Sequence, residues 1–382
     1  MSERVDDTGG DERTDPADRN PLAMLFQGDG WRLERRLDTR PVHEMYATLA
    51  ALVLTALIIS LLVILVGVSP LDAFTSLYEG ALGSREAGLE TLVQATPLIL
   101  TGLAAAVAFR SGVWNIGGEG QFFAGAIGTW WVYELLPGLP APLLIIAMFV
   151  GAAVAGALWA SAASVLLVRY GTNEILTTVM LNFVVLYILS WLLSGPWQSP
   201  KTPYFQTERM DEKTFLPRFI DDSRLHWGLL VALAAAVAVH LLTRRTGLGF
   251  ELRAIGVNKR AAAYKGISVG RTVITVMAIS GALAGIAGAG ELLGLHHRLQ
   301  LDIAEGLGFT GIIIALVARL HPAGVVVVAI AFGGLINGAT NMQVGTGIPF
   351  ALVQVIEGVA LVFVLLAAVA CRYRLKRTVR HG

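Results

Sequence analysis

Four polar stretches interrupt an otherwise apolar sequence, and the first is WNIGGEGQ at residues 114–121. It places a carboxylate (Glu119), two amides (Asn115 and Gln121) and three glycines between two apolar runs. Backbone outside regular structure is tolerated at membrane depth only where protein or a cavity supplies partners. The glycines would let a short helix begin near Glu119. Two interpretations follow: these groups line a path for a solute, or Asn115 and Glu119 only cap and terminate a helix.

The second stretch is GTNEILTTVMLN at residues 171–182. Glu174 begins an apolar run, and Thr178 and Asn182 follow at spacings of four, which places all three on one helical face. An amide within hydrocarbon requires a partner, so Asn182 is expected to face protein or a pore. Packing between helices and contact with a solute are both open interpretations.

The third stretch, ELRAIGVNKRAAAYKGISVGRT at residues 251–272, is basic and rich in alanine. It predicts one short amphipathic helix over 258–265, which Gly266 would stop. A basic loop on the inner side is expected from membrane topology alone, so its charge is not diagnostic. A separate helix in that loop would provide a binding surface for a partner protein.

The fourth stretch, GLGFTGIIIALVARLHPAG at residues 306–324, repeats the pattern of the first. A short apolar run is flanked by glycine and ends in a polar turn that contains His321 and Pro322. Two short, glycine-interrupted segments in the two halves of a membrane chain indicate a pseudo-repeat around a central path.

Catalytic and metal-binding patterns are missing from the sequence. It has no H-E-x-x-H, no Ser-His-Asp set, no paired carboxylates and no G-x-x-x-x-G-K-[ST] phosphate loop. The single cysteine, Cys371, forms neither an intramolecular bridge nor a metal cluster. We therefore expect no catalytic residue, no metal and no cofactor, and any nucleotide-driven step would need another subunit.

The elements that position these stretches follow from the composition of the 382 residues, of which 55% are hydrophobic and only 15% charged, with a net charge of +1. Soluble domains carry about 25% charged residues. Runs of roughly 18 or more apolar residues recur, as in membrane-spanning helices. We predict an all-α polytopic membrane protein with about ten transmembrane or partial helices (range 8–10) in pseudo-repeat halves. They lie near 46–68, 92–109, 122–136, 143–168, 175–193, 227–242, 272–293, 307–318, 323–339 and 350–370.

Orientation and boundaries follow from the charges. Four arginines between residues 32 and 40 precede the first run, and the chain ends in RYRLKRTVR and HG, which predicts both ends on the inner side. Residues 1–45 are predicted to be a largely disordered cytoplasmic tail, 46–371 the membrane domain with an inner loop at 244–271, and 372–382 a basic cytoplasmic tail. Small residues at Gly281, Gly285 and Gly288 predict close approach of another helix.

Five motifs occur along the chain in this order: NIGGEGQ, GTNEILTTVMLN, GVNKRAAAYKGI, SGALAGIAGA and GFTGIIIALVARLHPAG. In this order the chain, over roughly residues 90–340, resembles the permease subunits of ABC importers. The most similar branch is the one for nucleosides and simple sugars, which is related to the ribose-type and branched-chain amino-acid permeases. The resemblance implies import of a small polar solute through a core of two homologous permeases in the cell membrane. It also implies a cytoplasmic ABC ATPase that uses ATP, an extracytoplasmic solute-binding protein, contact with membrane lipid and no nucleic acid.

The resemblance also implies roles for particular residues. A coupling helix that docks on the ATPase would comprise Arg253, Asn258, Lys259, Arg260, Ala261, Ala262, Tyr264 and Gly266. Arg260 departs from the common pattern, in which an acid precedes two alanines. The solute pathway would involve Asn115, Glu119, Gln121, Asn182 and Phe309. The alternative is a secondary transporter driven by ions, which would act without an ATPase and use carboxylates such as Glu119, Glu291 or Glu357.

Overall fold

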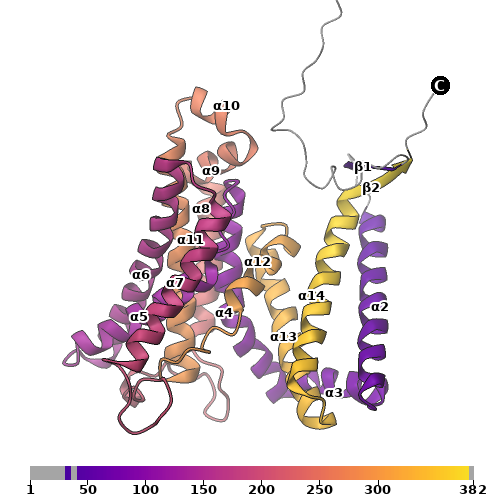
Figure 1. Ribbon diagram of the computed structural model, residues 1–382, viewed down its shortest axis with the longest axis horizontal. Coiled ribbons are helices and arrows are strands. Elements are labelled where there is room, and N and C mark those ends of the chain that lie inside the picture. The colour runs from indigo at the N-terminus through magenta and orange to yellow at the C-terminus, as the bar shows by residue number, and fades with distance from the viewer. Residues whose placement is uncertain (1–30, 36–40, 378–382) are drawn as a thin grey trace, which may run out of the picture.

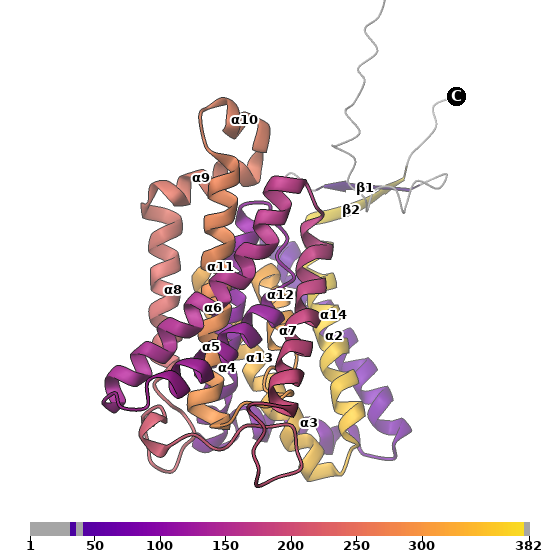
Figure 2. The same cartoon turned by 60° about the vertical axis from the view of Figure 1, so that its left-hand side comes forward.

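The computed structural model describes residues 31–35 and 41–377. Most of the predicted tail at 1–45, and residues 378–382 of the other tail, lie outside the described residues. The described chain is mainly helical, and its helices stand side by side (Figures 1 and 2). They are α2 (Pro41–Leu65), α3 (Pro70–Leu82), α4 (Arg85–Arg110), α5 (Gly118–Leu135), α6 (Ala141–Tyr170), α7 (Glu174–Ser194), α8 (Gly228–Arg245), α9 (Gly247–Val257), α10 (Lys259–Tyr264), α11 (Val269–Glu291), α12 (Leu307–Val317), α13 (Pro322–Thr346) and α14 (Phe350–Arg372).

Short elements complete the described chain. A 3₁₀ turn, η2, covers Glu212–Thr214, and a π-helical turn, η3 (Leu292–His296), extends α11. The strands β1 (Trp31–Arg35) and β2 (Tyr373–Arg377) pair antiparallel, with Leu33 opposite Leu375. This ribbon joins segments from the two ends of the chain.

Six helices of the described residues are long and apolar enough to cross a membrane: α4, α6, α7, α8, α11 with η3, and α13. The pair α2 and α3, which bends by 117°, would make a seventh span. The helical, multi-pass prediction is therefore confirmed at this level, whereas the count of ten stays a prediction. The sequence reading missed α3, because a 13-residue helix that carries Asp72 and Glu79 is too short and too polar for a spanning template.

α4 lies at the centre of the bundle, and its residues from Ala95 to Ala108 are all buried. It packs against α8, α11, α12 and α13. The predicted stripe of small residues on α11 is confirmed. A Cβ on Gly281 would lie 2.2 Å from the carbonyl oxygen of Gly156 on α6, and one on Gly288 would lie 2.3 Å from the carbonyl oxygen of Phe122 on α5. Glycine is required at these crossings because the backbones touch.

The bundle has two distinct ends. α10 projects from one end, where the β1–β2 ribbon also lies, and α3 lies at the opposite end with the loop between α7 and α8 (Figure 1). Figure 2 shows the same division after rotation. The predicted inner loop and the β1–β2 ribbon therefore share one end of the bundle. Which end faces the cytoplasm stays a prediction.

Candidate functional site: a buried polar cluster and an exposed hairpin

Asn115 lies at the centre of a group of buried polar side chains. The chain from 111 to 117, between α4 and α5, is not helical, and Gly112 there has a φ of +70°. The Asn115 amide donates to Gln121 Oε1 and to Ser280 Oγ, each at 2.9 Å. Its Oδ1 accepts from Gln121 Nε2 at 2.9 Å and from the Gly117 amide at 3.0 Å. Every polar atom of the Asn115 side chain therefore has a partner in the same chain.

Asn182 holds the same segment from α7. Its Oδ1 accepts from the Gly120 amide at 2.9 Å, and its Nδ2 donates to the Ile116 carbonyl at 3.1 Å. One turn earlier, Thr178 Oγ1 accepts from the Ile116 amide at 3.2 Å. Thr178 and Asn182 thus share a face, as their spacing predicts, and that face packs against protein.

Glu119 caps a helix other than its own. Its Oε1 accepts from the Gly306 amide at 3.0 Å and its Oε2 from the Gly308 amide at 2.8 Å, at the start of α12. Amides in a first helical turn have no acceptor within the helix, and the positive end of the helix dipole favours a carboxylate there. The Glu119 side chain, with the residue 6% exposed, therefore joins α5 to α12.

The predicted Asn115 cap is corrected by this geometry. α5 does begin near Glu119, at Gly118, but its N-cap residue is Gly117 and no side chain caps it. Asn115 binds the amide of Gly117 instead, so it closes a turn before the helix. Glu119 does lie in the first turn of α5, as predicted, and its carboxylate accepts from amides at the start of α12.

The starts of α5 and α12 touch through their backbones. A Cβ on Gly308 would lie 2.2 Å from the amide nitrogen of Glu119, so only glycine fits. The next residue, Phe309, has no hydrogen-bonding group in its side chain and is 44% exposed, so it does not join the group. We call Asn115, Glu119, Gln121, Thr178, Asn182 and Ser280 the polar cluster. Four of the five predicted pathway residues belong to it.

The predicted short helix of the inner loop is confirmed as α10. Asn258 is its N-cap residue, and its Oδ1 accepts from the Ala261 amide at 3.0 Å. The chain leaves the helix through Gly266, whose φ of +85° suits glycine. Tyr264 is 91% exposed, whereas Ala262 is buried. Lys259, Arg260 and Ala261 are also exposed.

α9, which the sequence reading missed, attaches α10 to the bundle. Gly256 packs on the end of α4, where a Cβ would lie 2.1 Å from the Arg110 carbonyl oxygen. The Arg253 guanidinium donates to the Thr243 carbonyl of α8. Glu251 accepts from the Thr272 hydroxyl of α11 at 2.7 Å. Residues 247–266, which we call the inner hairpin, therefore contact the ends of α4, α8 and α11.

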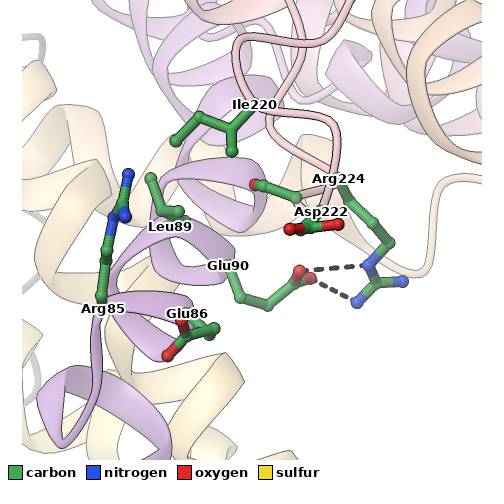
Figure 3. Close-up of a pocket in the computed structure, with 8 residues that line it drawn as sticks. Arg85, Glu86, Leu89, Glu90, Ile220, Asp222 and Arg224 are labelled. Carbon is green, nitrogen blue, oxygen red and sulfur yellow. Dashed lines mark hydrogen bonds and ion pairs between the residues drawn. The ribbon is translucent and has the colours of Figure 1, made fainter.

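A cavity of about 240 Å³ lies at the opposite end of the bundle, between the start of α4 and the loop between α7 and α8. Arg224 of that loop faces Glu90 of α4, and the guanidinium donates to both carboxylate oxygens, at 3.1 and 2.5 Å (Figure 3). Arg85 and Leu89 line the other side of this cavity (Figure 3). This bidentate pair fixes the loop on the bundle.

The sequence of this chain matches a known protein family. Residues 88–365 match the family described as "Branched-chain amino acid transport system / permease component". The match covers well over half of the chain. The chain belongs to this permease family. The resemblance to ABC importer permeases is confirmed, and so is the prediction of a multi-pass membrane protein.

Relatives with assigned names support the same placement of this permease. It is 36% identical to the guanosine ABC transporter permease protein NupP of Bacillus subtilis, over 89% of this chain and 98% of that protein. It is 35% identical to the glucose ABC transporter permease protein TsgB13 of Haloferax volcanii, over 90% of this chain and 93% of that protein. It is 32% identical to the nucleoside ABC transporter permease protein NupB of Lactococcus lactis, over 84% and 91%.

The sequence did not reveal three hydrogen-bonding groups of this site: the Ser280 hydroxyl and the backbone amides of Gly306 and Gly308. Ser280 immediately precedes the stripe of small residues and was not singled out, yet its hydroxyl accepts from Asn115 and donates to the Ala104 carbonyl at 2.7 Å. Its signal was a hydroxyl among glycines and alanines. The amides of Gly306 and Gly308 are backbone groups, which a reading of side-chain types does not find.

Proposed function

We propose that this permease forms the membrane path for a nucleoside or a simple sugar in an ABC importer, driven by separate cytoplasmic ATPase subunits and fed by an extracytoplasmic solute-binding protein. Three of its relatives carry guanosine, glucose and nucleoside in their names, which supports this substrate class. The permease itself would use no cofactor and perform no catalysis. A second permease, of the same or a homologous chain, would complete the path.

The inner hairpin is the observation that carries the proposal. Its α10 is exposed, so a partner can bind it, and its α9 is packed on the last turn of α4 through Gly256. The residues that follow α4, 111–117, hold Asn115 and lead directly into α5. A displacement of α10 by an ATPase would therefore act on α4 and the polar cluster through contiguous contacts.

The orientation follows from the same proposal. The inner hairpin and the β1–β2 ribbon share one end of the bundle, which would face the cytoplasm, so that the N-terminus and C-terminus would lie inside. The opposite end, with its Arg224–Glu90 pair and polar cavity, would face the solute-binding protein. Residues 244–265 at the first end include four arginines and two lysines, which supports a cytoplasmic location for it.

Among the pathway candidates, Phe309 has an exposed side chain that could contact the solute. The polar cluster uses its hydrogen-bonding groups internally, so its proposed role is to border the path and hold α5, α7, α11 and α12 in register. Phe309 is half-exposed beside the cluster, and an aromatic ring provides a face for a base or a sugar. Phe309→Ala is expected to raise the KM for uptake with little change in protein level. An unchanged KM would remove Phe309 from the path.

The coupling assignment is tested by reversing charge on α10. Lys259→Glu with Arg260→Glu is expected to abolish solute uptake and the stimulation of ATP hydrolysis by solute, while the protein still inserts. Gly266→Pro should do the same, because proline cannot adopt a φ of +85°. Lys213→Glu, at the other end of the bundle, is the matched control. Normal uptake by the α10 variants would contradict the assignment.

The energy source distinguishes this proposal from a secondary transporter. Uptake is measured in proteoliposomes that contain the assembled complex, first with ATP and no ion gradient, then with a proton or sodium gradient and a catalytically inactive ATPase. Only the first condition is expected to support uptake. The Glu119 carboxylate is engaged by two backbone amides, which leaves it poorly placed to carry ions. The Glu357 side chain lies outside the described residues.

The substrate class is tested by competition. Binding of radiolabelled guanosine and, separately, of radiolabelled glucose to the partner solute-binding protein is measured, each with unlabelled nucleosides and sugars as competitors, followed by uptake of whichever solute binds. Guanosine binding that only nucleosides displace selects the nucleoside class, and glucose binding that only sugars displace selects the sugar class. Binding of neither would overturn the substrate part of the proposal and leave the coupling part to its own experiment.

A further inference from the structure

An apolar groove of about 430 Å³ runs between α8 and α13, away from the polar cluster. It is lined by Leu233, Ala236, Val237 and His240 of α8 and by Ala323 and Val326 of α13. Five of these six residues are apolar, and Val237 and Val327 beside the groove are largely exposed. Such side chains on spanning helices meet hydrocarbon in a membrane. The groove is thus open to the lipid phase.

One end of the groove carries a cationic group. Ala236, His240 and Arg244 follow one another at spacings of four, so they form one stripe on α8. The His240 ring lies 5.8 Å from the His321 ring, measured between centroids. Arg244 Nη2 lies 3.3 Å from His321 Nε2, and because a guanidinium only donates, the imidazole nitrogen accepts. The apolar stripe therefore ends at a charged guanidinium.

The charge at this end is not balanced by an acid. Burial, together with the positive charges of Arg244 and Arg110, holds the pKa of His321 below its usual range, which favours a neutral imidazole beside the Arg244 guanidinium. Arg244 and Arg253 both lie near enough to Arg110 to repel its positive charge. Within the described ranges, the ion pairs involve Glu208, Asp211, Glu90 and Glu291, and none involves these three arginines.

The start of α13 adds to this positive potential. His321 is the N-cap residue and makes no side-chain cap, and Pro322 occupies the first turn. The first-turn amides of a helix lack internal acceptors and attract anions. The first turn of α13 also contributes Ala323 to the groove lining. A negative group at Arg244 would therefore lie beside a helix start at the polar end of an apolar groove.

We propose that the groove between α8 and α13 is a binding site for an anionic phospholipid. One acyl chain would lie along Leu233, Val237 and Val326, and the phosphate would bind Arg244 next to the start of α13. Basic pockets between helices at the cytoplasmic side bind acidic headgroups in this way. A free phosphate would leave the apolar lining uncovered, and an apolar peptide would leave Arg244 without a counter-ion. A phospholipid matches both parts.

The site would act on the turn between α12 and α13. Arg319 and Leu320 in this turn have φ values of +52° and +60°, which non-glycine residues seldom adopt, so the turn is constrained by its surroundings. A lipid held at Arg244 and His321 would fix this turn from the membrane side. α12, whose opposite end is capped by Glu119, would thereby be held at both ends.

The test is native mass spectrometry of the complex that contains the full-length chain, in detergent with equal amounts of palmitoyl-oleoyl phosphatidylglycerol and phosphatidylcholine. Arg244→Glu should lower retention of phosphatidylglycerol by about tenfold or more, because one attraction becomes a repulsion. Arg245→Glu, the adjacent arginine on a different face of α8, is the matched control and should change retention less than about twofold. Ala323→Trp, which fills the groove with all charges intact, should also reduce retention.

Each other outcome would overturn the site. Equal losses in Arg244→Glu and Arg245→Glu would mean a diffuse basic belt, and equal retention of both lipids would mean no headgroup recognition. Displacement by millimolar inorganic phosphate would mean an anion site without a lipid. If Ala323→Trp breaks the permease pair and leaves lipid retention unchanged, a second chain occupies the groove. Protein folding is checked by the unfolding temperature, which phosphatidylglycerol should raise in the wild type and in Arg245→Glu but not in Arg244→Glu.

Discussion

The polar cluster and the inner hairpin are both polar interruptions of an apolar chain, yet they are built in opposite ways. In the cluster, every polar side-chain atom of Asn115 and Glu119 has a partner in the same chain, and the partners Ser280, Gly306 and Gly308 come from distant parts of it. In the hairpin, Tyr264 is 91% exposed and Asn258 bonds only within its own helix start. The polar groups of the cluster therefore stabilise the fold of this chain, whereas those of the hairpin remain exposed and accessible to a partner.

Substitutions in the polar cluster and on α10 are expected to have different effects. A change in the polar cluster should lower the free energy of unfolding, because it leaves buried donors or acceptors without partners. A change on α10 should leave that free energy nearly unchanged and alter only what the ATPase does. The four substitutions below test this division with one pair of measurements: the unfolding temperature of the purified protein and the rate of ATP-driven uptake.

Gly308→Val should have the largest effect. Its Cβ would lie 2.2 Å from the Glu119 amide nitrogen, so α5 and α12 must separate at a cost of about 3 kcal/mol or more. Folded protein in the membrane should fall to a small fraction of the wild-type level. Gly290→Ala is the control, because a Cβ there meets no atom within 4 Å, and alanine favours a helix. Normal levels of Gly308→Val would mean that the two helix starts are not packed as described.

Glu119→Ala should come second. It leaves the amides of Gly306 and Gly308 without acceptors in a buried place, at a cost of about 1–3 kcal/mol. Glu119→Gln retains one acceptor oxygen and should fall between the alanine variant and the wild type. A lower unfolding temperature in that order supports a cap. Full stability with loss of uptake would instead place the carboxylate on the solute, and the contrast with the hairpin would break.

The polar cluster could be located from the sequence, but the hydrogen-bond partners of its residues could not. Alternation of glycine and polar residues marked 114–121 and 306–324, and the start of α5 at Gly118 follows from local rules about glycine. The partner of Glu119 lies 187 and 189 residues away, and no local rule names it. The same holds for Ser280 and Asn115, 165 residues apart. Distant pairing depends on how the whole bundle packs, which periodicity does not encode.

The hairpin divides in the same way. Asn258 and Gly266 bound α10 by their own conformational preferences, so the helix was predictable from its residues. α9 was missed because its apolar residues follow the basic pair at the end of α8, and Gly247 and Gly249 suggested a loop. Thr246, whose hydroxyl accepts from the Gly249 amide at 3.1 Å, starts this helix in spite of them.

Asn258→Ala should have a smaller effect, confined to the hairpin. Loss of the bond to the Ala261 amide weakens a six-residue helix by about 1 kcal/mol. The unfolding temperature of the bundle should hardly move, because α10 lies outside the core. Uptake should fall, since α10 would be presented to the ATPase in a frayed form. Asn258→Ser or Asn258→Asp, which can still cap, should restore it. A large drop in unfolding temperature would show that α10 supports the bundle.

Tyr264→Ala should have the smallest effect on stability, within about 0.5 kcal/mol, because the side chain is 91% exposed and has little packing to lose. Uptake is where the variant should differ, since an exposed aromatic residue on a projecting helix is suited to a partner's pocket. Tyr204→Ala provides the matched control: Tyr204 is 71% exposed at the opposite end of the bundle, and its loss should leave stimulation of ATP hydrolysis intact. Equal uptake and equal stimulation of ATP hydrolysis in the two tyrosine variants would mean that the exposed Tyr264 is not needed for coupling to the ATPase. A selective loss of coupling in Tyr264→Ala, with stability unchanged, would establish that the hairpin is completed by another subunit, as the polar cluster is completed by its own chain.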